Sequence, residues 1–475
     1  MKPIKKTKIV ATLGPSCDEQ NIIEKMILAG VNVFRVNFSH AKYEEVEDRI
    51  KKIRQADKKL NTQSAILADL QGPKLRVGKM EEGSVVHPED EVVFSTQAPF
   101  LGNAQKAYMN YQQFPKDVTP GEKILLDDGK LIFEVISTDK NTEVTTKVLQ
   151  GGPFKSNKGV NLPNTNISLP ALTEKDVKDA EFIFTQDVDW IALSFVRHSE
   201  DVLMLKDLMK KHLDKPLPVI SKIEKPEAIE NIDKIIAYSE GLMVARGDLG
   251  VEVPVAEVPL LQKELVLLSK KARIPIIIAT QMMETMTESL TPTRAEVNDV
   301  ANSVMDGADA VMLSGETSVG KYPVEVVETV RTIVMQVENS KRVIVPQDPP
   351  NIRTKRFITK SVCFHAAQIA TDIKANAICT LTNSGYTAYQ ISAWRPISNI
   401  LVFTSNKRIL TQLSLLWGVK AFYYDNFQST DNTVEEINAI AHQKGYVREE
   451  DLVVNLTAMP ISKKGMVNTL RVSVI

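Results

Sequence analysis

The sequence predicts an α/β protein: a (β/α)8 TIM barrel with an inserted mostly-β domain and a C-terminal three-layer α/β domain. Three observations predict this architecture. Eight short apolar runs alternate with amphipathic stretches of helical period, a strand-like segment interrupts them after the third run, and a new strand–helix rhythm begins near residue 340. A doubly wound parallel sheet would produce similar patterns, so it stays an alternative at this point.

The composition is that of an ordinary globular chain. Its 475 residues suggest about three domains, and a formal net charge of −1 with 25% charged residues gives no sign of a nucleic-acid or membrane partner. The six histidines show no zinc-binding spacing, and no apolar run approaches the roughly 18 residues that a membrane span needs.

The cysteines predict a reducing, cytoplasmic location, because they are odd in number, far apart and form no CxxC pair: Cys17, Cys363 and Cys379. Near the N-terminus, the apolar stretch Ile9–Leu13 is short and Gly14-Pro15 stops it. A signal peptide is therefore not expected.

The first three strands are predicted at Lys8–Thr12, Val31–Asn37 and Ser64–Asp69. Gly14-Pro15 ends the first of them and Gly72-Pro73 follows the third, as expected of residues that break regular structure.

Residues 73–167 predict an inserted β-rich domain, since short alternating runs are separated there by turn residues. Ile124–Leu126 and Leu131–Ile136 flank Asp127-Asp128-Gly129, which is a hairpin signal. The two aspartates could suggest a metal site, but turn chemistry explains them better.

The strand–helix rhythm resumes near Leu169. Five further strands are predicted at Trp190–Phe195, Val219–Ile223, Gly241–Ala245, Pro275–Thr280 and Ala308–Leu313. Helical period between them, as in Ala228–Ser239 and Val258–Arg273, completes eight units. The predicted barrel domain thus comprises residues 1–72 and 168–340.

A separate α/β domain is predicted for residues 341–475, after the chain passes Asp348-Pro349-Pro350. It opens with a helix at Lys360–Ile373 and a strand at Ala377–Leu381, and helices and strands continue to Val474.

The chemistry is expected at the carboxyl ends of the barrel strands. Lys222 and Glu224 are two residues apart, so they project from one side of a strand, and Asp248 follows the next strand. Two carboxylates suit a magnesium ion that also holds phosphate, and a fixed lysine suits charge stabilisation in phosphoryl transfer.

Other strand ends carry polar groups too: Arg35, Asn37 and Ser39, then Asp69, Thr280, Ser314 and Glu316. Each alone could be a cap or a turn residue. Together with the two strand ends that carry Lys222, Glu224 and Asp248, however, six strand ends bear polar groups, and this predicts one polar site. The segment Arg246-Gly247-Asp248 also offers main-chain N–H groups to a carboxylate or phosphate.

Gly315–Lys321 matches the GxxxxGK pattern of phosphate-binding loops. Tyr322 stands where that motif needs a magnesium-binding hydroxyl, and Pro323 follows it. A phosphate-loop ATPase is therefore not favoured.

Taken together, these motifs resemble the pyruvate kinase family. The matching segments are Lys8–Pro15, Asn32–His40, Asp69–Pro73, Ser221–Glu224, Val244–Gly250, Ala279–Met282, Pro292–Glu296 and Met312–Thr317. The resemblance implies a cytoplasmic, magnesium-dependent phosphotransferase that transfers the phosphoryl group of phosphoenolpyruvate to ADP, giving pyruvate and ATP in the last step of glycolysis. It also implies an allosteric homotetramer.

Catalytic and substrate-binding roles carry over from the resemblance. Lys222 is expected to stabilise the transferring phosphoryl group and Arg35 to contact phosphate. The main chain of Gly247 is expected near the substrate carboxylate, and Thr280 near the face where the enolate is protonated. Ser314 and Glu316 are expected to relay that proton.

The resemblance also assigns the metal and the nucleotide. Glu224 and Asp248 are the expected ligands of Mg2+, and Mn2+ accepts the same oxygen ligands. The nucleotide side is expected at Asn37, His40, Arg76 and Lys158. Arg76 and Lys158 belong to the inserted domain, which in the family closes as a lid and excludes water.

One departure from the family predicts that potassium is not required. Many members hold potassium near the positions of Asn37, Ser39, Asp69 and Leu70 and carry a glutamate close by. This chain has Lys74 there, and its compact ammonium charge could replace the monovalent cation.

A phosphorylated effector is expected at the loop after Leu381, where the family binds a sugar-phosphate or nucleotide activator: Thr382, Asn383, Ser384, Gly385 and Thr387. Tyr386 occupies a position where a basic residue is common, so the ligand stays open. An ordinary strand-to-helix turn is an equal alternative.

Two other readings stay open. A barrel lyase or aldolase of the phosphoenolpyruvate and pyruvate type would use similar carboxylates but needs no nucleotide lid. A catalytically silent metabolite sensor is the other reading, and Lys222, Glu224 and Asp248 argue against it.

Overall fold

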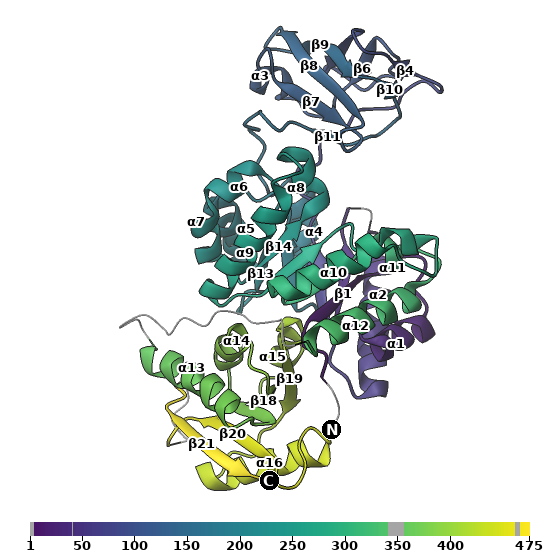
Figure 1. Cartoon of the computed structure of the whole chain (residues 1–475). Helices are drawn as coiled ribbons and strands as arrows, with labels where there is room; N and C mark the ends of the chain where they lie inside the picture. Colours follow the sequence, from purple (N-terminus) through teal and green to yellow (C-terminus); the bar gives the residue numbers. More distant parts are fainter. Residues whose placement is uncertain (1–3, 40, 341–355, 461–465) are drawn as a thin grey trace.

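A computed structural model describes residues 4–39, 41–340, 356–460 and 466–475. Figure 1 shows three bodies one above another, with the inserted β-rich body at the top, the barrel in the middle and the C-terminal α/β body at the bottom. In the described part of the chain, no helix has both the length and the apolar character to cross a membrane.

The barrel is closed and parallel, with strand order β1-β16-β15-β14-β13-β12-β3-β2. Its strands are β1 (Lys8–Thr12), β2 (Val33–Asn37), β3 (Ala65–Asp69), β12 (Trp190–Leu193), β13 (Val219–Ile223), β14 (Gly241–Ala245), β15 (Ile276–Ala279) and β16 (Ala310–Leu313). All eight predicted strands are therefore confirmed, and closure of the sheet rules out the doubly wound alternative.

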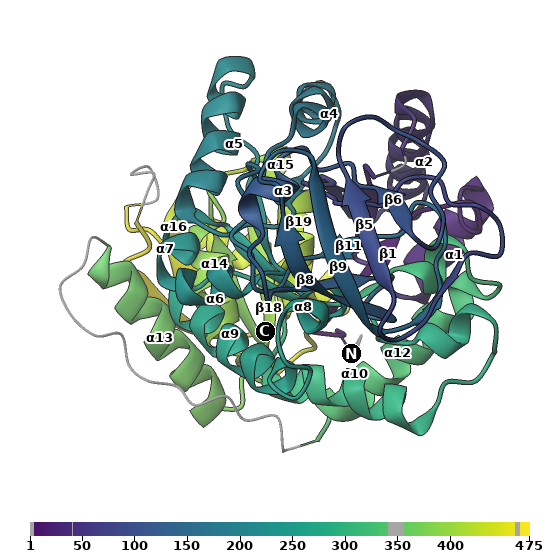
Figure 2. The same cartoon turned by 90° about the horizontal axis from the view of Figure 1, so that it is seen from above.

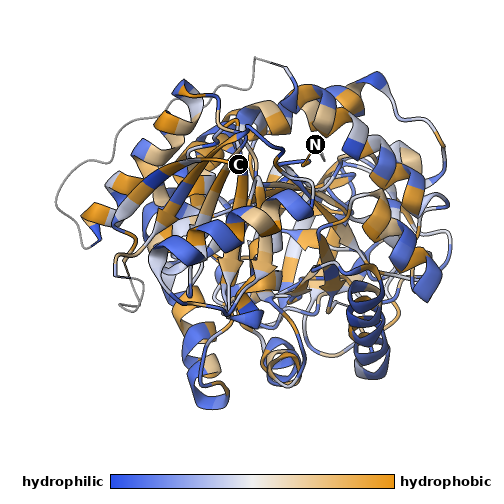
Figure 3. Cartoon of the chain, turned by 90° about the horizontal axis from the view of Figure 1, so that it is seen from below, coloured by the Kyte–Doolittle hydropathy of each residue, from blue (hydrophilic) through white to orange (hydrophobic). Residues whose placement is uncertain are grey.

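Helices surround the barrel: α1 (Gln20–Ala29), α2 (Tyr43–Leu60), α4 (Glu174–Phe184), α5 (Ser199–His212), α6 (Pro226–Glu230), α7 (Ile232–Tyr238), α8 (Arg246–Glu252), α9 (Val258–Ala272), α10 (Arg294–Asp306), α11 (Gly315–Ser318) and α12 (Pro323–Glu338), with a 3₁₀ turn at Glu284–Thr287. Figure 3 shows apolar strands inside and polar outer helix faces. The helical period predicted at 228–239 is confirmed, but as two helices, because Asn231 leaves helical geometry between α6 and α7 and its side chain bonds to the Glu227 carbonyl.

The inserted body contains a six-stranded sheet in the order β11-β7-β8-β9-β5-β6. Its elements are β4 (Val85–Val86), β5 (Glu91–Ser95), β6 (Lys106–Tyr108), α3 (Phe114–Asp117), β7 (Lys123–Leu126), β8 (Leu131–Thr138), β9 (Glu143–Gln150), β10 (Gly152–Pro153) and β11 (Val160–Asn161). The predicted hairpin is β7–β8, and its three turn residues, 127–129, all have positive φ. Figure 2 shows this sheet above the barrel, and we call this body the lid.

The C-terminal body has a five-stranded sheet in the order β19-β18-β17-β20-β21, parallel except for β21. Its elements are α13 (Phe357–Asp372), β17 (Ala377–Leu381), α14 (Tyr386–Ala393), β18 (Asn399–Thr404), α15 (Lys407–Gln412), a 3₁₀ turn (Leu413–Leu415), β19 (Val419–Tyr423), α16 (Thr430–Gln443), β20 (Leu452–Thr457) and β21 (Thr469–Val474). The predicted opening helix and first strand are both present.

The C-terminal body closes the lower end of the barrel. Leu415 is fully buried and joins the core inside the barrel, in one cluster with Val10, Trp190 and Met312. Close by, the Arg395 guanidinium and the Asp309 carboxylate form a buried ion pair with an Nη2–Oδ2 distance of 2.9 Å. Hydrophobic and ionic contacts together fix the two bodies to one another.

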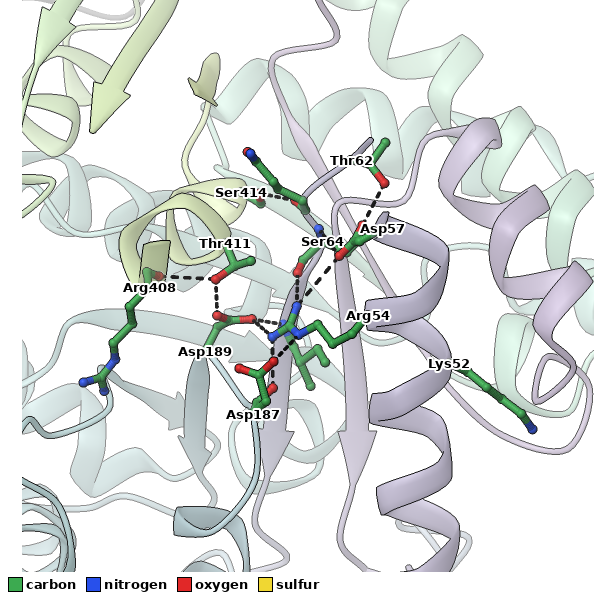
Figure 4. A network of polar contacts seen from close by, with 12 residues as sticks. Lys52, Arg54, Asp57, Thr62, Ser64, Asp187, Asp189, Arg408, Thr411 and Ser414 are labelled. Carbon is green, nitrogen blue, oxygen red and sulfur yellow. Dashed lines mark hydrogen bonds and ion pairs between the residues drawn. The ribbon is translucent and has the colours of Figure 1, made fainter. Parts of the chain in front are cut away.

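A second polar network joins the same two bodies (Figure 4). The buried Asp189 carboxylate accepts hydrogen bonds from Arg54 Nη2 at 2.8 Å, from the Ile66 N–H at 2.8 Å and from the Thr411 hydroxyl. Burial raises the pKa of Asp189 against the opposing effect of Arg54. Arg408 donates to main-chain carbonyls of the barrel at residues 215 and 216. This end of the barrel therefore serves stability, and the opposite end is left for chemistry.

Candidate active site

At the upper end of the barrel, a buried carboxylate lies between two cations. Asp69 ends β3 and its side chain is only 1% exposed. Arg35 Nε from β2 lies 2.6 Å from Asp69 Oδ2, and Lys222 Nζ from β13 lies 3.4 Å from Oδ1. Arg35 also donates to the Thr12 hydroxyl at the end of β1, at 3.1 Å. Four strand ends thus converge on one charged cluster.

The charges of this cluster stabilise one another. Burial opposes ionisation of Asp69, but Lys222 and Arg35 outweigh it and hold the pKa of Asp69 below its ordinary value. Burial likewise opposes the Lys222 ammonium, but Asp69 and Glu224 outweigh it and hold the pKa of Lys222 above its ordinary value. Lys222 therefore stays a cation although it is buried.

Three groups fix the direction of the Lys222 ammonium. Besides Asp69, it contacts Glu224 Oε1 at 3.1 Å and donates to Ser194 Oγ at 2.7 Å. The Ser194 hydroxyl in turn donates to the Leu70 carbonyl at 2.6 Å. This chain of hydrogen bonds links β13 to the segments that follow β12 and β3.

The Glu224 carboxylate is positioned by the main chain. Its Oε2 accepts the Phe195 N–H at 2.7 Å, and Phe195 adopts a left-handed conformation with φ of 53°. Burial raises the pKa of Glu224, and the charge of Asp248 adds to this effect. The carboxylates of Glu224 and Asp248 therefore lie close enough to repel each other.

A divalent cation fits this pair. Asp248 lies half-buried in the first turn of α8, and among the described residues its carboxylate has no hydrogen-bond or ion-pair partner. The described residues contain no cluster of three or more His, Cys, Asp or Glu side chains that could hold a metal. The donor set is thus two carboxylates, which suits Mg2+ that keeps waters and substrate oxygens as its other ligands.

Thr280 and Gly247 lie in direct contact. The Thr280 hydroxyl accepts the Gly247 N–H at 2.7 Å, and Thr280 holds a φ of 68°, which is strained for a β-branched residue. Arg246 supports the arrangement, since it bonds to Asp299 through both terminal nitrogens and to the Thr280 carbonyl. A cavity of about 660 Å³ opens beside α8 and is lined by Gly247, Asp248 and Asp128 of the lid, but not by Lys222.

Ser314 and Glu316 lie after β16. The buried Glu316 carboxylate accepts two main-chain N–H groups, from Ser314 at 2.7 Å and from Met283 at 3.1 Å. Both of its oxygens are thereby engaged in holding the loops after β15 and β16. This geometry favours a positioning role for Glu316, and a proton relay through it stays a prediction.

The nucleotide-side residues lie on two bodies. Asn37 Oδ1 accepts the Ser39 N–H at 3.1 Å at the end of β2, whereas Arg76 and Lys158 lie on the lid. Arg76 donates to the main chain at residue 157, and Lys158 pairs with Asp127 at 2.9 Å, which lowers the pKa of Asp127. Asp127 is therefore more than a turn residue. His40 lies outside the described residues.

The region at which potassium or its substitute is predicted lies where the chain leaves β3. Lys74 is exposed on the chain that enters the lid, and the Leu70 carbonyl is occupied by the Ser194 hydroxyl.

The loop at which an effector is predicted, residues 382–387, belongs to the C-terminal body. The Gly385 N–H bonds to the Thr382 hydroxyl at 3.0 Å, and the Asn383 carbonyl accepts from Asn406 at 3.1 Å. Thr387 is buried, and the Arg356 guanidinium lies 4.5 Å from the centre of the Tyr386 ring. A basic group thus lies beside the loop.

Three residues that hold the site were not singled out by sequence: Thr12, Ser194 and Phe195. For Ser194 a signal existed, since it is a polar residue within the predicted apolar run 190–195. For Phe195 no pattern reveals that its main chain supports a carboxylate.

We expect Ser194→Ala to lower catalytic turnover about tenfold or more, because a hydrogen bond to a charged group is worth about 1.5–3 kcal/mol. Steady-state kinetics with circular dichroism would check it. Ser137→Ala, at an exposed position on β8, is the control. Unchanged turnover would show that Ser194 does not orient the Lys222 ammonium.

Comparison with known proteins assigns the family. The family model for the pyruvate kinase barrel domain matches residues 4–327, and the model for the pyruvate kinase alpha/beta domain matches residues 360–473. A pyruvate kinase of Bacillus licheniformis is 41% identical over 99% of this chain and 81% of its own length, and one of Corynebacterium efficiens is 41% identical over 98% and 97%. A crystal structure of a pyruvate kinase from Cryptosporidium parvum matches with a TM-score of 0.91 at 30% identity, over 99% of this chain and 96% of that one. The chain belongs to the pyruvate kinase family.

Proposed function

We propose that this protein transfers the phosphoryl group of phosphoenolpyruvate to ADP and releases pyruvate and ATP. One observation carries the proposal: a buried, oriented lysine ammonium contacts Glu224, and the charge of Glu224 interacts with Asp248, a carboxylate without a partner among the described residues. Donor and acceptor are both anionic, so such a reaction needs fixed positive charge at the point where they meet.

The attraction between one fixed cation and an anionic phosphoryl group is large enough to change the reaction rate strongly. A unit charge pair about 4 Å apart at an effective dielectric near 20 is worth about 4 kcal/mol, or roughly a thousandfold in rate. In this proposal Lys222 faces the transferring phosphoryl group and Arg35 contacts a phosphate oxygen. Glu224 and Asp248 hold the Mg2+ ion, which supplies further positive charge when it is bound.

The remaining assignments follow the same reasoning. Gly247 N–H and Thr280 Oγ bond to each other, so a substrate carboxylate that binds Gly247 would release the Thr280 hydroxyl. Thr280 then faces the enolate, while Ser314 and Glu316 hold or supply the proton. Asn37, His40, Arg76 and Lys158 contact ADP, the last two when the lid closes.

We also propose the coarser properties that the family suggests: a cytoplasmic homotetramer in which residues 1–72 and 168–340 form the catalytic domain, 73–167 the lid and 341–475 a regulatory domain. Sedimentation velocity would test the tetramer, and a monomeric protein would contradict it. The lyase or aldolase alternative is not favoured, because the family match covers nearly the whole chain.

We expect Lys222→Met to lower kcat by at least about a hundredfold with the fold intact, because it removes the charge that offsets phosphate repulsion. A coupled assay of ADP-dependent pyruvate release measures it. Lys178→Met, on the exposed face of α4, is the control. Near-normal turnover of Lys222→Met would refute the assigned role.

We expect activity without potassium, because the Lys74 ammonium replaces a monovalent cation. Assays in potassium, sodium and tetramethylammonium salts at equal ionic strength would give similar rates. Lys74→Glu should become potassium-dependent, whereas Lys79→Glu, an exposed control on the same segment, should not. A wild-type protein that is inactive in tetramethylammonium would contradict the proposal.

We expect a phosphorylated effector to bind at residues 382–387. Ser384→Asp should abolish activation by sugar phosphates or nucleoside monophosphates, since an added negative charge repels phosphate. Activity titrated with fructose 1,6-bisphosphate, glucose 6-phosphate and AMP measures it, with Gln443→Glu as an exposed control. Equal activation of wild type and Ser384→Asp would exclude this loop.

A further inference from the structure

A fully buried ion pair joins the two segments that carry the metal-site carboxylates. Lys225 directly follows Glu224, and Glu252 ends α8, one helical turn beyond Asp248. Lys225 Nζ lies 2.7 Å from Glu252 Oε1, and the two side chains are 7% and 0% exposed. The pair therefore connects the end of β13 to α8 directly behind the site.

The same carboxylate holds the lid. Asn161 on β11 donates its side-chain N–H to Glu252 Oε1 at 2.8 Å. Figure 1 shows β11 directly above α8. Glu252 Oε2 is buried without a hydrogen-bond partner, and Glu252 and Asn161 both line a cavity of about 40 Å³ between lid and barrel. Around this contact the two bodies are thus not tightly packed.

Both chain crossings into the lid are anchored to the barrel. The Gly72 N–H donates to Asp176, a fully buried carboxylate at the start of α4, at 3.0 Å. On the return crossing, the Arg197 guanidinium donates to the carbonyls of Ile167 and Leu169. With both crossings anchored, rotation of the lid about them changes the contact between β11 and α8.

We propose that Glu252 is a positioning residue for the reaction, which together with Lys225 fixes Asp248 relative to Glu224, and through Asn161 couples the position of the lid to α8. The inference rests on the proposed function, in which Glu224 and Asp248 hold the divalent ion. It adds that the metal site and the lid share one buried carboxylate, so that metal binding and lid position influence each other.

The physical reason is the cost of a buried charge. The Glu252 carboxylate needs its partners, because an unpaired charge at this depth is unfavourable. A lid movement that withdraws Asn161 leaves Lys225 as the remaining partner of Glu252 Oε1. In this proposal α8 then shifts so that Glu252 regains its contact with Asn161. Since α8 begins with Gly247 and Asp248, this movement reaches both the substrate-facing main chain and the metal ligand.

The first part of the proposal, that Glu252 positions Asp248 relative to Glu224, is tested by the affinity of the protein for metal in the absence of turnover. We expect Glu252→Gln to raise the Kd for Mn2+, measured by electron paramagnetic resonance without substrates, by about 10- to 100-fold, as outer-shell partners of metal ligands do. Glu230→Gln, at an exposed position on the nearby α6, is the matched control and should bind as wild type does. A folded Glu252→Gln protein with wild-type affinity would overturn the proposal.

The second part, that Asn161 couples the lid to α8, is tested by hydrogen exchange. This test does not require the Glu252→Gln variant to fold. In Asn161→Ala, amides of α8 should exchange at least about fivefold faster than in wild type, because the lid no longer protects them. Asn141→Ala, at an exposed lid position, is the control. Equal exchange of α8 in Asn161→Ala and wild type would overturn the coupling.

The outcomes distinguish this inference from the proposed function. A wild-type protein that fails to bind Mn2+ would refute the metal site itself. Wild-type binding with unchanged affinity in Glu252→Gln and unchanged exchange in Asn161→Ala would leave the metal site standing and refute only the role of Glu252.

Discussion

The attraction of two cations for one buried carboxylate is the interaction on which the site depends. Asp69 holds Arg35 on one side and Lys222 on the other, and without it two positive charges would face each other in a poorly solvated space. The strand order β13-β12-β3-β2 makes this geometry possible, because β12 lies between the strands that carry Lys222 and Asp69 and is followed by Ser194, which bonds to Lys222. The cations are thereby oriented before any substrate arrives, which is the basis of electrostatic catalysis.

The fold was predictable because strands buried on both faces leave a simple signal. Strands such as Gly241–Ala245 and Ile276–Ala279 are uniformly apolar, and all eight predicted runs form the barrel. Closure did not follow from the local pattern alone, since a doubly wound sheet has the same pattern. The count of eight strand–helix units predicted the closed barrel, which is confirmed. The break between α6 and α7 at Asn231 leaves no mark on the helical period, because a side-chain bond to the main chain competes with helical geometry without changing the apolar spacing.

The structure brings together charged groups that were predicted at strand ends, whereas the sequence offers little sign of the residues that support them. The two-residue spacing of Lys222 and Glu224 predicts that they project from the same side of a strand, and the structure brings them into contact. Phe195 supports Glu224 through its main chain, which no residue type encodes. The partnership of Lys225 with Glu252 depends on three-dimensional proximity across 27 positions of the chain, so sequence alone gave no reason to pair them.

Leu415 of the C-terminal body packs into the lower end of the barrel interior, so residues outside the barrel complete its core. A fragment ending before the C-terminal body would open the interior at Val10, Trp190 and Met312 to water and leave the charge of Asp309 unmatched. The barrel core is therefore completed by residues of the C-terminal body. A shorter chain without that body would need other residues to cover the barrel interior and to pair with Asp309.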